Sequence, residues 1–229
     1  MSEATLKSQL RLLADPGYQQ FISHLLPTVN PETILGIRMP VLRKLAQQIA
    51  NENPEQFFES VTDETYEERL LHGFVICYLD VELTRKIGLV RQFIPKIDNW
   101  AVCDSFCSRL NLPEKYPAEM WDFILPYLHD QDEYSARFGL VMLMIYYINE
   151  EYRDQSLEQL NLFRNQAYYA RMAAAWAIAS CFSKFPVETL RFLQDCSLDN
   201  WTYNKALQKI IESRTSTESD KKIIRSMKR

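Results

Sequence analysis

Trp100 and Asp104 have the residue types and the spacing to bind a positively charged partner. A helix is expected over residues 98–110, with Asp98 or Asn99 as its N-cap, because apolar residues recur there at helical spacing. Side chains four positions apart lie next to each other on one face of a helix. An electron-rich indole beside a carboxylate therefore predicts a site for a cation on this helix.

A pattern recurs along the chain with a period of about 34 residues. In three segments a Tyr is followed three positions later by an Arg, at Arg69, Arg137 and Arg171. Arg137 and Arg171 are 34 residues apart, and Arg69 lies two such periods before Arg137. The same register places residues 100–104 in the missing period and Lys205 in the last one.

Repeats of this length, with two helices each, predict an all-α fold, namely an α-α superhelix of the HEAT-like solenoid kind. Gly is rare, with 5 among 229 residues, and no segment has the pattern of a strand. Because the connections between the expected helices are short, we expect residues 1–229 to form a single domain. Stacked helical pairs curve, and the second helix of each pair lines a concave groove.

The register makes Asp104 unusual. Its equivalent positions in the other repeats are all apolar: Leu70, Phe138, Met172 and Ala206. A carboxylate at a packing position is costly unless it has partners or a task, which favours a functional role. A register shifted by one residue would instead make Asp104 an ordinary surface acid.

Basic residues share another equivalent position of the repeats, occupied by Arg69, Arg137, Arg171 and Lys205. This arrangement predicts a basic stripe along one face, of the kind that follows a phosphate backbone. Alternatively, the arginines join neighbouring repeats through Glu and Asp partners. The sequence leaves both interpretations open.

The composition, with 47% hydrophobic and 24% charged residues, predicts a folded chain rather than a disordered one. No apolar run reaches the roughly 18 residues that span a bilayer, and the N-terminus lacks the build of a signal peptide. Five cysteines without framework spacing are typical of a reducing compartment, so we expect a cytoplasmic protein. A net charge of −4 argues against polyanion binding over the whole surface but allows a basic face.

No metal or cofactor site is predicted. Cys103 and Cys107 are four apart and could share a metal, but no further ligand lies near them in the sequence. Two buried thiols are the simpler interpretation. The three histidines show no ligand or triad spacing.

Taken together, these residues resemble the AlkD branch of the DNA alkylation repair glycosylases. Those proteins are HEAT-like solenoids that remove N3- and N7-alkylated purines from DNA. The resemblance covers nearly the whole chain and depends on the order and spacing of several motifs. They are residues 35–40 with 42–45, which match the family's Leu-Gly-[Ile/Val]-x-x-Pro opening, the Trp100 and Asp104 pair, Arg137 and Trp176.

The resemblance implies a catalytic role for Asp104, Trp100 and Trp176. The carboxylate would stabilise the developing positive sugar or orient water, and the two indoles would contact the cationic nucleoside. The resemblance also implies that the protein acts on DNA without a cofactor, and we expect a monomer. The expected DNA contacts are Arg137 at a flanking phosphate, with Arg38, Arg43, Arg171 and Lys205.

The sequence also departs from the family pattern. The arginine expected three positions after Trp176 is Ala179, and the acid that often follows Trp100 is Ala101. Pro27 and Pro31 should break the helix where the family has a DNA-contacting one. Two alternatives follow: a non-catalytic relative that binds branched or otherwise unusual DNA, and a solenoid scaffold for a protein partner.

Overall fold

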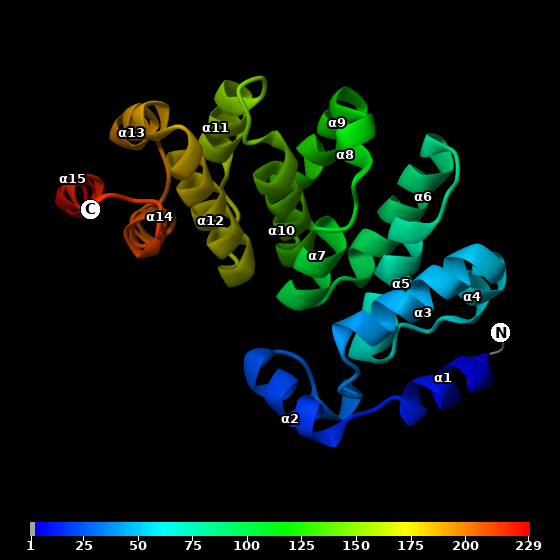
Figure 1. Cartoon of the computed structure of the whole chain (residues 1–229). Helices are drawn as coiled ribbons and strands as arrows, with labels where there is room; N and C mark the ends of the chain where they lie inside the picture. Colours follow the sequence, from blue (N-terminus) through cyan, green and yellow to red (C-terminus); the bar gives the residue numbers. More distant parts are fainter. Residues whose placement is uncertain (1–2) are drawn as a thin grey trace. The chain divides into compact units, whose positions relative to one another are not determined.

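The computed structural model describes residues 3–229, and their regular structure is entirely helical, without a strand in that range (Figure 1). The predicted all-α class is therefore confirmed. The helices are α1 (Glu3–Leu12), α2 (Pro16–Leu25), the 3-10 turn η1 (Pro31–Thr33), α3 (Met39–Glu52), α4 (Pro54–Ser60), α5 (Tyr66–Tyr78), α6 (Leu83–Phe93), the 3-10 turn η2 (Ile94–Lys96), α7 (Trp100–Cys107), α8 (Leu112–Lys115), α9 (Pro117–Leu128), α10 (Glu133–Met142), the π-helical turn η3 (Leu143–Tyr147), α11 (Arg153–Leu162), α12 (Tyr168–Lys184), α13 (Pro186–Asp195), α14 (Asn200–Glu212) and α15 (Glu218–Ser226).

The chain divides into two compact units, Met1–Leu110 and Asn111–Arg229. In the first, α5 packs against α3 and α7. Helix α4 packs against α3, and α6 packs against α5. In the second, α12 packs against α10 and α14, and helices α9, α11, α13 and α15 pack against this row. Each unit thus consists of stacked helices in the manner of an α-α solenoid. The single domain and the repeat period remain predictions.

Local sequence signals explain where several helices begin and end. The Asn99 side chain accepts a hydrogen bond from the Val102 backbone N–H at 3.0 Å, so Asn99 is the N-cap of α7. The helix is shorter than the expected 98–110 and ends at Cys107. Between α2 and α3, where Pro27 and Pro31 lie, the only helical turn is η1, which confirms the predicted break.

Helix α12 shows how composition permits close packing. Its alanines Ala170, Ala173, Ala174 and Ala177 are all buried. Because the distance between packed helices depends on the side chains at the contact, these small residues let α10 and α14 lie close to α12.

Within residues 3–229, no helix has both the length and the apolar character to cross a membrane. The five cysteines are free and buried. The cytoplasmic location stays a prediction.

Candidate functional site

Helix α7 of the first unit carries Trp100 and Asp104, one turn apart and both half-buried. The indole Nε1–H of Trp100 donates to the backbone carbonyl of Leu25 at 3.4 Å. Leu25 is the last residue of α2, so the position of this helix and the orientation of the indole depend on each other.

The apolar residues at positions equivalent to Asp104 mostly pack in the core. Leu70, Phe138 and Ala206 are buried, and Met172 is half-buried. Asp104 differs from the three buried residues in exposure as well as in type. It lies at the boundary between the interior and solvent, where a polar side chain keeps part of its hydration.

The start of α7 is attached to α5 through a short polar network. The fully buried Asn99 donates from Nδ2 to Asp98 Oδ1 at 2.8 Å, and Arg69 Nη1 lies 3.2 Å from Asp98 Oδ2. Arg69 therefore joins α5 to the residues just before α7, as the alternative interpretation of the arginines expects.

The position of α2 depends on a buried carboxylate. Glu67 is fully buried and accepts hydrogen bonds from the backbone N–H groups of Leu35, Gly36 and Ile37 at 2.8, 2.7 and 3.2 Å. Burial raises the pKa of the Glu67 carboxyl, and the three hydrogen bonds oppose that shift. Gly36 has φ +83°, and a Cβ added to it would collide with the backbone of Asp15 and Gln19 at the start of α2.

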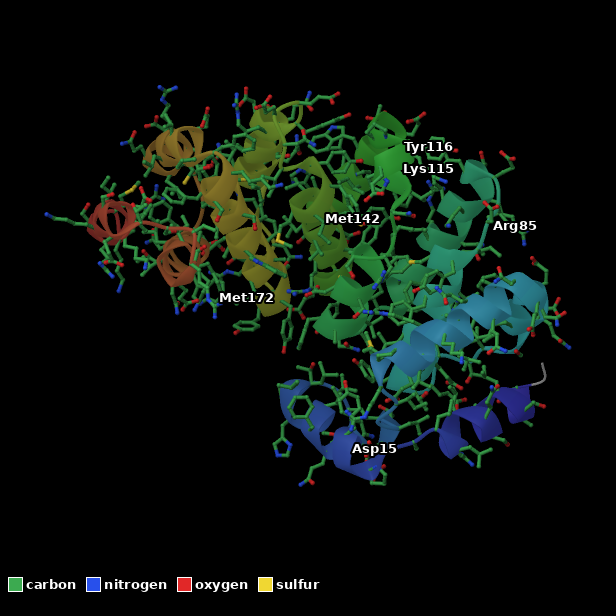
Figure 2. The ribbon with its side chains drawn as sticks, in the orientation of Figure 1. Asp15, Arg85, Lys115, Tyr116, Met142 and Met172 are labelled. Atoms are coloured by element: carbon green, nitrogen blue, oxygen red, sulfur yellow. The ribbon has the colours of Figure 1, made fainter. Side chains whose placement is uncertain are left out.

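Arg38 is also engaged with α2. Its Nη2 lies 3.0 Å from Asp15 Oδ2, and its guanidinium carbon lies 4.7 Å from the centre of the Tyr18 ring. Asp15 is the N-cap of α2 and marks the start of that helix in Figure 2. Arg43 differs: its guanidinium packs on Phe74, and its Nε is buried without a hydrogen-bond partner.

In the second unit, Arg137 is almost completely buried on α10. Its Nη1 donates to the backbone carbonyl of Tyr169 at 2.9 Å. The Tyr169 ring stacks on that of Tyr134, with centroids 5.8 Å apart, and its backbone N–H donates to Glu133 Oε1 at 2.6 Å. The Arg137 guanidinium carbon lies 6.0 Å from the centre of the Tyr169 ring, which belongs to an aromatic pair contributed by α10 and α12.

Arg171 on α12 is engaged with the start of α14. It forms an ion pair with Asp199, donates from Nε to Thr202 Oγ1 at 3.2 Å, and packs 4.3 Å from the centre of the Trp201 ring. Burial opposes ionisation of Asp199, but hydrogen bonds from Thr202 and Arg171 keep its pKa below the ordinary value. Lys205 instead bonds to an amide, donating to Gln208 Oε1 at 2.8 Å.

Trp176, on α12, is 44% exposed. It borders a shallow depression of about 220 Å³ whose lining includes Ala179, Ser180, Lys209 and Glu212. Ala179 lines this depression in place of the arginine of the family pattern, and Lys209, from α14, places a cation there that is paired with Glu212.

The candidate residues are therefore grouped within each unit. The first unit brings together Trp100, Asp104 and α2, and the second places Arg137, Arg171 and Lys205 in the first halves of α10, α12 and α14. Sequence analysis did not single out Glu67 or Asp199. Within the part of the chain that the structure describes, no group of three or more His, Cys, Asp or Glu side chains could hold a metal ion.

The sequence profile of a family described as DNA alkylation repair enzyme matches residues 6–210, which is most of the chain. A search of curated proteins found no match.

Proposed function

The chain belongs to the DNA alkylation repair enzyme family, and we propose that it is a DNA glycosylase of the AlkD-like type that removes N3- and N7-alkylated purines. The observation that supports this most is the pair on α7: an indole oriented by the end of α2, with a half-buried carboxylate one turn away. Family membership supports a role in repair of alkylated DNA, and the pair supports the chemistry.

Alkylated purines need little catalytic machinery. The base already carries a positive charge, so it leaves without a general acid, whereas ordinary glycoside hydrolysis uses two carboxylates. Asp104 stabilises the positive charge that develops on the sugar or orients the attacking water. The electron-rich faces of Trp100 and, as the second tryptophan of the family pattern, Trp176 attract the cationic nucleoside.

The basic residues contribute unequally to DNA binding in this proposal. Arg171 and Arg38 are paired with Asp199 and Asp15, so their charges are partly neutralised before DNA arrives. Lys205 and Arg43 have no carboxylate within ion-pair distance among the described residues, so they attract phosphate more strongly. Arg137 is assigned to a flanking phosphate on the family pattern.

The test is release of methylated purines from methylated duplex DNA, comparing the wild-type protein with Asp104→Asn. We expect the variant to release bases at least about 100-fold more slowly than wild type, because a fixed charge at the developing cation is removed. Asp80→Asn, an exposed carboxylate on the loop after α5, is the matched control and should act like wild type. Equal release by wild type and Asp104→Asn would refute the role of Asp104.

One observation favours a second function. Arg38 and Arg171 are paired with acids, which weakens their attraction for the phosphates of duplex DNA. If the folded wild-type protein binds branched DNA in a salt-sensitive way but releases no methylated base, the glycosylase proposal fails. The protein would then be a non-catalytic relative that binds DNA.

A further inference from the structure

A cavity of about 620 Å³ lies between α14 and α15, and none of the residues assigned to catalysis lines it. Its apolar lining includes Leu207, Ile211 and Ile224. A volume of this size is in the range of small-molecule sites, which span about 300–1,000 Å³. Trp201 lines the same cavity.

The charge of the lining is strongly positive. Lys205, Arg225 and Lys228 all line the cavity, and no carboxylate of the described residues forms an ion pair with any of them. Glu212 is the acid in the lining, and it accepts hydrogen bonds from Lys209 at 3.1 Å and from Gln208 at 2.7 Å. The cavity therefore attracts anions.

The Trp201 ring is held in place by its neighbours. The Arg171 guanidinium lies 4.3 Å from the ring centre, and the Tyr168 ring packs edge-on with centroids 5.8 Å apart. The indole is still half-exposed, and the Lys205 ammonium lies 5.5 Å from its centre. A ring that is already ordered loses little conformational freedom when a second aromatic ring stacks on it.

A flat apolar surface next to several unpaired cations matches one chemical group well, a nucleotide. Its base stacks on an aromatic ring, and its phosphate binds Lys and Arg. Bases within a duplex are stacked on one another, so a base that contacts Trp201 must be unpaired.

We propose that the cavity between α14 and α15 binds an unpaired nucleotide of a DNA strand, with the base on Trp201 and the phosphate among Lys205, Arg225 and Lys228. That the nucleotide belongs to DNA rests on the proposed function. The proposal goes beyond removal of a damaged base, since it predicts preference for DNA that carries a single-stranded segment next to the duplex.

The experiment measures fluorescence anisotropy of a labelled oligothymidine and of a blunt duplex of the same length, over a range of salt concentrations. The test variant is the triple substitution Lys205→Gln, Arg225→Gln and Lys228→Gln. The matched control, Arg191→Gln, Arg214→Gln and Lys222→Gln, removes the same charge from exposed residues of the second unit that do not line the cavity.

We expect the test variant to bind oligothymidine about 10-fold more weakly, with a salt slope lower by about 0.7 for each lost phosphate contact. The control should stay within about 2-fold of wild type. Trp201→Phe keeps a ring for stacking and should retain most of the affinity, while Trp201→Ala should lose it. Equal loss in the test and control variants, or loss for the blunt duplex alone, would overturn the proposal.

Competition identifies the source of the ligand. Displacement of oligothymidine by thymidine monophosphate, but not by inorganic phosphate at equal concentration, supports a nucleotide site that also accepts free nucleotides. If only unlabelled oligothymidine displaces the labelled strand, and thymidine monophosphate does not, the site requires a polymer of nucleotides. Equal displacement by inorganic phosphate would overturn the contact between the base and Trp201.

The same variants separate this proposal from the glycosylase. Cavity-dependent binding of single strands by a protein that releases no methylated base would leave the cavity proposal standing and remove the glycosylase. Base release by the wild type, with identical single-strand affinity in the test and control variants, would support the glycosylase and remove the cavity proposal.

Discussion

Replacing Gly36 with alanine tests how strongly the buried Glu67 carboxylate and the start of α2 depend on each other. Gly36 has φ +83°, a conformation that costs an L-residue about 1–2 kcal/mol. A Cβ at this position would lie 2.5 Å from the backbone nitrogen of Gln19 and closer still to the carbonyl oxygen of Asp15. Both atoms belong to backbone, so the neighbouring segments must move apart.

Such a movement breaks at least one of the hydrogen bonds from residues 35–37 to Glu67. A buried hydrogen bond to a charged group contributes about 1.5–3 kcal/mol. Together with the backbone strain, Gly36→Ala should lower the free energy of unfolding by about 3–5 kcal/mol. Gly88→Ala is the matched control, because a Cβ on Gly88 of α6 meets nothing within 4 Å.

The assay is urea unfolding followed by far-UV circular dichroism. Gly88→Ala should raise the free energy of unfolding by about 0.5–1 kcal/mol, as expected when glycine in a helix is replaced. A loss of less than about 2 kcal/mol for Gly36→Ala would refute the reasoning, since backbone strain alone would then account for it. A folded Gly36→Ala protein should also release methylated bases more slowly, because the end of α2 orients Trp100.

Three further outcomes follow from the buried groups. Glu67→Gln should lower the free energy of unfolding by about 2–4 kcal/mol in urea, since a neutral amide accepts three backbone N–H groups less well than a carboxylate; an unchanged midpoint would contradict this. Burial opposes ionisation of Asp63, but His72 and Lys96 hold the pKa of that carboxyl below its ordinary value. Their stabilisation is therefore complete above about pH 4 and lost as the pH falls through the folded pKa, so the unfolding free energies of wild type and Asp63→Asn should converge below about pH 4. Parallel pH profiles would argue against that partnership. Burial raises the pKa of Cys77 and Cys181 to about 12, and all five cysteines are buried, so a thiol reagent should label none in the native protein and five after unfolding. Rapid labelling of any native thiol would show that the structure around it opens.

In the two proposals, both units of the chain contact DNA. Family membership predicts contact with alkylated DNA, while the cavity at α14 and α15 predicts contact with an unpaired nucleotide. A protein with both properties would favour damage next to a gap or a branch, and base release from nicked and intact substrates would measure that preference.

Features that depend on residues close together in the chain could be read from the sequence. Asn99 starts α7 because its side chain reaches an N–H three residues on, and Pro27 and Pro31 prevent a helix by local geometry. The apolar residues Leu70 and Phe138 are buried because helical periodicity places them on the packed face.

The partners of the charged and aromatic side chains were decided only by the tertiary structure. A repeat register predicts that arginines recur on one face, but it does not predict which acid the next helix places beside them. Arg69 meets Asp98 and Arg171 meets Asp199 because the stacking of successive helices places those pairs within reach. Glu67 binds backbone groups about 30 residues earlier in the chain for the same reason. Ion pairs, buried carboxylates and cavities depend on distances between elements, which no local pattern of residues specifies.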